Sequence, residues 1–287
     1  MFIKHGSSDT ALTFRSLLFV PGARPDRFEK AAAAGADAMI IDLEDAVLPE
    51  DKEAARAATF DWLSAYGGPS KAGVRINSPR TADGCRDIGA LSARGLAPAF
   101  LMVPKAETGV DLEIVREATG DVAPIIAVIE SPRGLTEAPA IASQALGGVL
   151  FGGADYSASL AADLSDWQAM LTARSLIANA CALAGVPAYD VPYLDTGDEA
   201  GLTEATAKAK AMGFSGRACI HPKQVSAVNA VFTPTEEEID DAKAIIAALE
   251  AAQGGAVLHR GKLVDRPIIL AAQRTLAKTR TLAKSEI

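Results

Sequence analysis

Two acidic residues, Glu130 and Asp155, each end a short apolar run that is typical of a β-strand. The runs are PIIAVIE (124–130) and GGVLFGGAD (147–155), and they lie one strand–helix repeat apart. Because the carboxyl ends of parallel strands meet at one rim of a sheet, we expect the two carboxylates to converge there. Hard oxygen donors favour Mg²⁺ or Mn²⁺. The alternative is that each acid caps the next helix or pairs with a nearby base.

Further polar residues lie at or near the ends of the other predicted strands. Arg75 is the most informative, since a charge inside an apolar strand is costly unless it is paired. Its partner is either a bound substrate carboxylate or a neighbouring acid, Glu44 or Asp45, and both roles are compatible. The remaining members of the set are Arg24, Asp42, Asn77, Lys105, Asp190 and His221.

Eight apolar runs, rich in Val, Ile, Leu and Phe, predict the strands that position these residues. Their near-continuous hydrophobicity is typical of strands buried on both faces of a parallel sheet. The runs span 16–22, 38–45, 72–78, 99–105, 124–130, 147–155, 186–192 and 216–222.

Helix-like segments separate the apolar runs, and glycine follows several of them, as at a helix C-terminus. Examples are 25–34 before Gly35, 50–66 before Gly67, 166–184 before Gly185 and 199–212 before Gly213. Eight such units over roughly 220 residues predict an α/β fold of the TIM (β/α)8 barrel type. A doubly wound open sheet is the alternative, but no switch point is evident.

The chain continues beyond the eighth predicted strand. We expect a barrel domain over 14–231 and a C-terminal extension over 232–287, which packs on the barrel rim or on a neighbouring subunit. Thr235 followed by Glu238 predicts a capping box that opens a helix over 235–253. Residues 254–269 read as a hairpin-like or extended segment, and a last helix starts at about Pro267.

Composition excludes several classes of protein. The chain has 287 residues and a net charge of -8, which argues against a nucleic-acid binder. No run of about 18 apolar residues predicts a membrane span. The first residues lack an apolar signal core, so we expect a cytoplasmic protein. The three cysteines are scattered, which supports neither a zinc site nor a disulfide framework.

Six motifs, in order, resemble the citrate lyase β-subunit-like branch of the HpcH/HpaI aldolase and citrate lyase superfamily. They are RSLLFVPG (15–22), DLEDAV (42–47), VRINS (74–78), VPKAE (103–107), IESPRGL (129–135) and FGGADYSASL (151–160). In addition, GKLVDRP (261–267) resembles the C-terminal segment of malyl-CoA and citramalyl-CoA lyases.

The resemblance implies a TIM barrel in which Glu130 and Asp155 bind Mg²⁺ and Arg75 holds the carboxylate of an oxo or hydroxy acid. It implies a homotrimer or homohexamer whose C-terminal segment reaches a neighbour, where Asp265 acts on the thioester end. The alternative for Asp265 is a solvated pair with Arg266 or Lys262. Asp45 stands where simple aldolases of the superfamily carry a histidine base, which favours the CoA-thioester lyases. His221 does not match the position of that base and is expected to be structural or to hydrogen-bond a site residue, rather than to be catalytic.

The expected reaction is therefore Mg²⁺-dependent cleavage of a malyl-CoA or citramalyl-CoA type thioester to a 2-oxo acid and acetyl-CoA. Asp42, Glu44 and Asp45 are expected to position water on the metal and Arg75. Lys105 and Arg15 are candidate substrate contacts, and Arg15, Arg24 and Lys30 are candidates for the CoA phosphates. Alternatives are a citrate lyase β subunit, a malyl-CoA thioesterase or malate synthase, and a non-catalytic barrel.

Overall fold

The computed structural model describes residues 13–68, 70–251, 257–260 and 262–285. The chain divides between Asn229 and Ala230 into two compact units. The first unit contains the strands β1–β8 and the helices that alternate with them. The second contains two long helices and a short hairpin.

Eight parallel strands close into a barrel, in which each strand pairs with the next and β8 returns to β1. This confirms the predicted TIM barrel. The strands are β1 (Ser16–Pro21), β2 (Ala38–Asp42), β3 (Lys71–Arg75), β4 (Leu101–Val103), β5 (Ile125–Ile129), β6 (Gly148–Phe151), β7 (Ala188–Asp190) and β8 (Gly216–Cys219).

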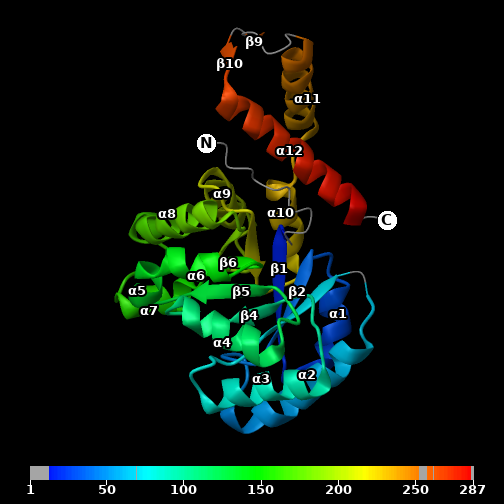
Figure 1. Ribbon diagram of the computed structural model, residues 1–287, viewed down its shortest axis with the longest axis vertical. Coiled ribbons are helices and arrows are strands. Elements are labelled where there is room, and N and C mark those ends of the chain that lie inside the picture. Colours follow the sequence, from blue (N-terminus) through cyan, green and yellow to red (C-terminus); the bar gives the residue numbers. More distant parts are fainter. Residues whose placement is uncertain (1–12, 69, 252–256, 261, 286–287) are drawn as a thin grey trace. The chain divides into compact units, whose positions relative to one another are not determined.

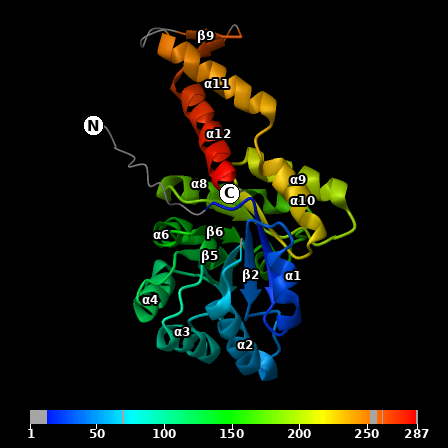
Figure 2. The same ribbon diagram turned by 90° about the vertical axis from the view of Figure 1, so that its right-hand side faces the viewer.

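Helices surround the barrel, as Figure 1 shows for one face and Figure 2 for the view turned by 90°. They are η1 (Pro25–Arg27), α1 (Phe28–Ala32), η2 (Pro49–Asp51), α2 (Lys52–Ala65), α3 (Ala82–Arg94), α4 (Gly109–Thr119), α5 (Pro132–Thr136), α6 (Ala138–Gln144), α7 (Gly153–Ser159), α8 (Trp167–Ala184), α9 (Glu199–Ala211) and α10 (Lys223–Phe232). Gly185 caps α8 in the left-handed conformation, as its position in the sequence predicts.

Alternation along each strand divides the core into two layers. Side chains from seven strands, among them Leu17, Ile40, Met102, Val128 and Tyr189, form one cluster that fills the barrel. The apolar strand residues next to Met102, Val128 and Tyr189 belong to a second cluster, which lies between the barrel and the helices. Because successive side chains of a strand point to opposite faces, this parity decides which polar residues at strand ends face the barrel mouth.

Within the barrel, β3 contributes Gly73 at an inward position. A Cβ there would lie 2.4 Å from the ring of Phe100, so the glycine makes room for that side chain. The next inward position on β3 is Arg75, which places the guanidinium at the carboxyl end of the barrel.

The apolar runs were predicted to be longer than the strands are. The largest difference concerns the sixth run, because β6 ends at Phe151 and Gly152 leads directly into α7. Asp155 therefore lies in the first turn of α7, and the prediction that it ends a strand is wrong. The apolar character of 147–155 reflects burial at the strand–helix junction, which does not require extended backbone.

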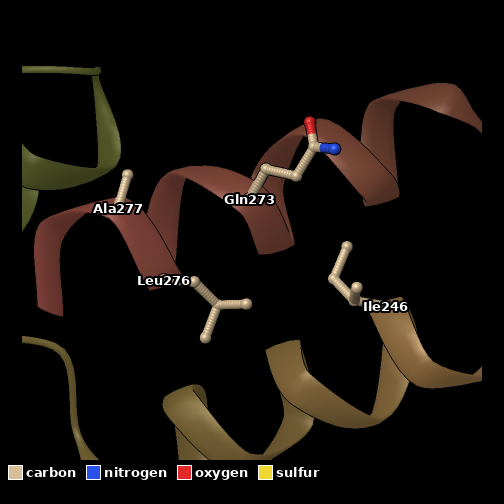
Figure 3. Close-up of a pocket in the computed structure, with 4 residues that line it drawn as sticks. All are labelled: Ile246, Gln273, Leu276 and Ala277. Atoms are coloured by element: carbon tan, nitrogen blue, oxygen red, sulfur yellow. The ribbon is translucent and has the colours of Figure 1, made fainter. Parts of the chain in front are cut away.

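In the second unit, α11 (Glu236–Ala251) packs against α12 (Arg266–Ser285), and β9 (Val257–His259) pairs antiparallel with β10 (Lys262–Val264). The predicted capping box is present, since Glu238 N donates to Thr235 Oγ1 and Thr235 N donates to Glu238 Oε2. A pocket of about 270 Å³ lies between the two helices, lined by Ile246 of α11 and by Gln273, Leu276 and Ala277 of α12 (Figure 3).

Docking of this unit on the rim or on a neighbouring subunit stays a prediction. No helix within the described part of the chain has the length and apolar character needed to cross a membrane.

Candidate active site

Strand parity brings three of the predicted residues to the mouth of the barrel. Asp42 and Glu130 share parity with the inward residues Ile40 and Val128, and Arg75 shares it with Gly73. All three lie at or directly after the carboxyl ends of their strands. The chemistry of α/β barrels is built at this end.

Arg75 is held in a two-pronged ion pair. Its Nε and Nη2 donate to the two oxygens of Asp42 at 2.7 and 2.6 Å, and its Nη1 lies 3.2 Å from Glu44 Oε2. The guanidinium also lies 5.0 Å from the ring centre of Phe19. Burial opposes the charge, but the hydrogen bonds to Asp42 and its negative charge outweigh burial and raise the pKa of Arg75. Its main partner is thus Asp42 rather than the expected Glu44 or Asp45.

Asp42 also organises the loop after β2. One of its oxygens accepts a hydrogen bond from Glu44 N at 2.9 Å and the other from Ala46 N at 3.1 Å. With the two bonds from Arg75, both carboxylate oxygens of Asp42 are occupied. Asp42 therefore positions Arg75 and Glu44, and its contacts leave it no direct part in bond breaking.

Lys105 connects the acids of neighbouring loops. Its Nζ contacts Glu44, and it lies 3.3 Å from Asp45 and 3.7 Å from Asp155. Burial opposes its charge, but the hydrogen bond to Glu44 and the surrounding carboxylates raise the pKa of Lys105. Its backbone has φ 52, a strained conformation for a residue with a side chain, and such strain concentrates at functional sites.

Glu130 follows β5 and is buried, with 7% of its surface exposed. The strained turn at Lys105 directs the backbone N–H of that residue to Glu130 Oε1 at 2.6 Å. Burial, together with the charge of Glu44, raises the pKa of Glu130 to about 7. Glu44 is buried as well, and this burial raises its pKa despite the nearby Arg75 and Lys105.

Gly152 is a functional position that the sequence analysis missed. A Cβ at residue 152 would lie 2.4 Å from Glu130 Cβ and 2.7 Å from Glu130 Oε2. Only glycine leaves room for the Glu130 side chain in its observed position. The GG pair at 152–153 was the available signal, since glycine inside an apolar run often marks close approach of another group.

We define the acidic cluster as the five carboxylates Asp42, Glu44, Asp45, Glu130 and Asp155, with the cations Arg75 and Lys105. When all of them are ionised, five carboxylates face two cations, which is a surplus of three negative charges. The raised pKa of Glu130 reports this surplus together with burial. A divalent cation is the group that such a set of donors fits.

Glu130 and Asp155 fit the predicted pair of metal ligands. Glu130 lies after β5, Asp155 lies on α7, and Lys105 contacts both residues. Among the described residues, no group of three or more His, Cys, Asp or Glu side chains has the arrangement of a complete metal site. Two protein carboxylates are typical of Mg²⁺, which keeps its other positions for water and substrate.

Several predicted site residues lie elsewhere. Arg15 precedes β1, at the amino end of the barrel, where its side chain pairs with Asp37 at 2.7 Å. The prediction that Arg15 contacts substrate or CoA does not fit this position, because parallel strands carry the acidic cluster at their opposite ends. The prediction followed from proximity to β1 in sequence, which does not distinguish the two ends of a strand.

Three further predicted residues make contacts within the protein outside the acidic cluster, namely Asp190, Asn77 and His221. Asp190 shares its strand with the inward-facing Tyr189 and therefore points outward, away from the acidic cluster, where it pairs with Arg174 at 2.9 Å. Asn77 donates to Leu43 O and accepts from Lys52. His221 Nδ1 accepts from the N–H of Lys223, a local contact after β8 that agrees with the expectation.

The candidate CoA contacts Arg24 and Lys30 are exposed, and Arg24 pairs with Asp26 at 2.7 Å. Asp265 belongs to the second unit, is exposed, and its carboxylate contacts Ile268 N at the start of α12. None of these three residues belongs to the acidic cluster within the described chain.

Comparisons with known proteins agree with this geometry. A model of the HpcH/HpaI aldolase/citrate lyase family matches residues 15–222, and a model described as a C-C bond lyase of the TIM-barrel fold matches residues 182–281. Citrate lyase subunit beta of Leuconostoc mesenteroides subsp. cremoris is 34% identical, over 95% of this chain and 96% of the relative. A (3S)-malyl-CoA thioesterase of Cereibacter sphaeroides is 37% identical, over 94% and 96%.

Among solved structures, the CitE protein of Mycobacterium tuberculosis in complex with magnesium, acetoacetate and coenzyme A is 34% identical and has a TM-score of 0.80. The match covers 94% of this chain and 100% of that one. With a barrel whose mouth carries the motifs of the family, this chain belongs to the HpcH/HpaI aldolase/citrate lyase family and is a carbon–carbon bond lyase.

Proposed function

We propose that this enzyme cleaves a 3-hydroxyacyl-CoA thioester of the malyl-CoA or citramalyl-CoA type to a 2-oxo acid and acetyl-CoA, with Mg²⁺ as cofactor. The observation that carries the proposal is the acidic cluster. It combines an excess of carboxylates, suited to a divalent cation, with one buried guanidinium suited to a carboxylate. The relatives' names and the ligands of the M. tuberculosis structure support the same class of substrate.

Arg75 binds and orients the substrate carboxylate. Asp42 holds its Nε and Nη2, which leaves the Nη1 side of the guanidinium toward Glu44. Because Asp42 fixes the guanidinium, its Nη1 side meets the substrate carboxylate in one orientation, and the adjacent carbon is positioned with it. This is the step for which Arg75 cannot be replaced by a point charge.

Glu130 and Asp155 would hold Mg²⁺, which when bound supplies Lewis-acid stabilisation of negative charge at the oxygen beside the bond to be cleaved. Glu44 Oε2 is buried and makes no hydrogen bond, although it lies 3.2 Å from Arg75 Nη1 in an ion pair. We assign to this atom the acceptance of the hydroxyl proton, because burial raises the pKa of Glu44 and makes it a stronger base than an exposed carboxylate. Lys105 keeps Glu44, Asp45 and Asp155 together by its charge.

As the carbon–carbon bond breaks, its electron pair passes to the carbon next to the thioester, which must then receive a proton. We propose Asp265 of a neighbouring copy as this general acid, and hence a homotrimer or homohexamer. Asp265 is exposed and precedes α12, so its carboxylate is available to a partner. Arg24 and Lys30 are proposed contacts for the CoA phosphates.

A cleavage assay tests the proposal. Purified protein receives malyl-CoA, citramalyl-CoA or citryl-CoA with Mg²⁺, and the 2-oxo acid, acetyl-CoA, free CoA and hydroxy acid are all quantified. We expect equal amounts of 2-oxo acid and acetyl-CoA from malyl-CoA or citramalyl-CoA, and loss of both products with EDTA. Absence of turnover on all three thioesters would contradict the proposal.

A thioesterase is the second candidate, because a relative of that name is 37% identical over nearly the whole chain. Release of free CoA together with intact hydroxy acid would identify it. Cleavage of citryl-CoA to oxaloacetate and acetyl-CoA, with no reaction of the smaller thioesters, would instead identify the activity for which citrate lyase β subunits are named.

A further inference from the structure

A second charged group lies on the outer side of the barrel, between β7, β8 and the helices α8 and α9. Asp190 of β7 accepts from Arg174 Nε at 2.9 Å and pairs with Arg217 Nη2. Arg217 also donates to Val191 O at 3.0 Å and to Ala205 O at 3.2 Å. Asp190 and Arg217 are at most 1% exposed, and the Arg174 side chain is 5% exposed.

In this group the positive charges outnumber the negative ones. Two guanidinium groups share the single carboxylate of Asp190. Arg174 Nη1 and Arg217 Nε are buried and have no hydrogen-bond partner. Burial lowers the pKa of Arg217, and the charge of Arg174 adds to this effect against the opposing charge of Asp190. A buried donor without a partner is destabilising, so an additional anion would lower the free energy here.

A pocket of about 320 Å³ adjoins both arginines. Arg174 and Arg217 form part of its lining, and most of the remaining lining is apolar, with Leu164, Trp167 and Val191 among its members. Pockets that combine an apolar wall with a few polar groups are typical of sites for small organic molecules. Leu164 and Val191 also lie against Gly153 at the start of α7, so the pocket shares a wall with the helix that carries Asp155.

The mouth of the pocket limits the charge of a ligand. Asp163 and Asp195 line it and are exposed. Each is engaged with its own loop, since Asp163 accepts from the N–H and hydroxyl of Ser165 and Asp195 accepts from Gly197 N. Neither carboxylate makes an ion pair with Arg174 or Arg217, and their negative charges repel a multiply charged anion such as phosphate more strongly than a monocarboxylate.

We propose that this pocket binds an organic monocarboxylate with an apolar body. The carboxylate balances the excess positive charge of Arg174 and Arg217, whose side chains line the pocket, and the apolar body packs beside Trp167 and Leu164. The site is separate from Arg75, because Asp190 and Arg217 point outward from strands whose inward residues fill the barrel. It therefore goes beyond the proposed lyase reaction and does not depend on it.

The fluorescence of Trp167, which lines the pocket, can report the binding of a ligand there. The chain has two tryptophans, and Trp62 packs on Phe28 and Tyr66 away from the pocket. In a Trp62→Phe protein, the emission of Trp167 would be followed during titration with 3-phenylpropanoate. The neutral 3-phenylpropanamide and inorganic phosphate are the controls, and saturation-transfer NMR of the ligand gives an independent measure of binding.

Two matched variants on α9, each in the Trp62→Phe background, separate the pocket from the rest of the protein. Ala205 lines the pocket, so Ala205→Phe fills it without removing a charge. Ala207 is exposed on the same helix and is not among the lining residues. We expect saturable binding of 3-phenylpropanoate in the Ala207→Phe protein and at least about tenfold weaker binding in the Ala205→Phe protein, because of the steric overlap.

The carboxylate should bind more tightly than the amide, and phosphate should not compete with it. Equal binding of acid and amide would overturn the role of the arginines. Unchanged binding in Ala205→Phe, or no binding to the folded parent by either method, would overturn the site itself.

Discussion

Gly152 has a hydrogen atom where any other residue has a Cβ, and this leaves room for Glu130, a proposed metal ligand. We expect Gly152→Ala to displace the Glu130 carboxylate, since the new Cβ would lie 2.4 Å from Glu130 Cβ. Overpacking of this kind costs about 1–3 kcal/mol, and we expect Mg²⁺ affinity to fall about tenfold. Isothermal titration with Mg²⁺ measures the effect.

Gly89→Ala is the matched control for that variant. A Cβ at Gly89, in the middle of α3, meets no atom within 4 Å. We expect it to leave Mg²⁺ affinity unchanged and to raise stability by about 0.5–1 kcal/mol, because alanine loses less backbone entropy in a helix than glycine does. Parent-like Mg²⁺ affinity in Gly152→Ala would remove Glu130 from the set of metal ligands.

The proposed role of Arg75 requires the planar shape of its guanidinium as well as its charge. Arg75→Lys keeps the charge but cannot make the two bonds to Asp42 at 2.7 and 2.6 Å. We expect kcat/KM to fall about 100-fold, which corresponds to about 2.7 kcal/mol. Arg80→Lys is the control, because Arg80 makes a similar two-pronged pair with Asp111 outside the acidic cluster. A similar loss of activity in both variants would show that Arg75 has no special role.

The three thiols differ in reactivity because they differ in burial. Burial raises the pKa of Cys181 and of Cys219 to about 12, whereas Cys85 is exposed. The thiolate is the reactive form, so both buried cysteines stay protonated and unreactive up to strongly alkaline pH. We expect a chromogenic disulfide reagent at pH 8 to modify one thiol in the native protein and three after unfolding. Reaction of a second thiol in the native state would contradict these pKa values.

At the scale of elements, buried carboxylates hold neighbouring strand–helix units together. Asp87 of α3 is fully buried and accepts from Arg56 Nε of α2 at 2.6 Å. It also accepts from the backbone N and the Nδ2 of Asn77, after β3, both at 2.7 Å. One side chain thus fixes two helices and the loop that follows Arg75.

We therefore expect Asp87→Ala to destabilise the protein by about 3–5 kcal/mol, because the guanidinium of Arg56 loses its buried partner. Urea unfolding followed by circular dichroism measures the change in midpoint. Asp83→Ala is the control, since Asp83 is partly exposed and lies 3.5 Å from Arg56 Nη2. We expect that variant to cost less than about 1 kcal/mol. Equal effects of both substitutions would contradict the special role of Asp87.

For the molecule as a whole, the acidic cluster links metal binding to stability. Its surplus of negative charge opposes folding without a cation, because like charges repel at this partly buried site. We expect Mg²⁺ to stabilise the fold by about 2.7 kcal/mol at a concentration of 100 times its Kd. EDTA should reverse the gain, which differential scanning calorimetry detects as a fall in Tm.

The Glu130→Gln variant tests whether Mg²⁺ stabilises the fold by binding at the acidic cluster. The variant removes one negative charge from the cluster, so it should be at least as stable as the parent in EDTA but should gain little from Mg²⁺. NaCl at matched ionic strength controls for screening. An equal rise in Tm for parent and variant would show that Mg²⁺ acts elsewhere on the chain.

The succession of strands and helices could be predicted because it depends on local patterns. Near-continuous apolar runs indicated all eight strands, glycine marked the end of α8, and Thr235 with Glu238 marked the start of α11. Acidic and basic residues at strand ends then indicated Glu130, Arg75 and Glu44, because parallel strands of a barrel bring their carboxyl ends together.

Strand parity held further information that the sequence analysis did not use. Asp42 and Glu130 lie in register with inward residues, whereas Asp190 is adjacent to the inward Tyr189 and must point outward. The grouping of Asp190 with the rim residues was therefore wrong, because a strand places successive side chains on opposite faces. The same parity distinguishes the acidic cluster from the pocket at Arg174 and Arg217.

The sequence by itself determined the fold class, the family and most of the charged residues at the barrel mouth, since these depend on periodicity, spacing and motif. Only the tertiary structure decided that Arg75 makes its two hydrogen bonds to Asp42, rather than to Glu44 or Asp45. It also decided that Gly152 makes room for Glu130. In addition, it left Arg174 and Arg217 with one carboxylate between them. These contacts join residues from different strand–helix units, and their geometry depends on packing distances that no local pattern contains.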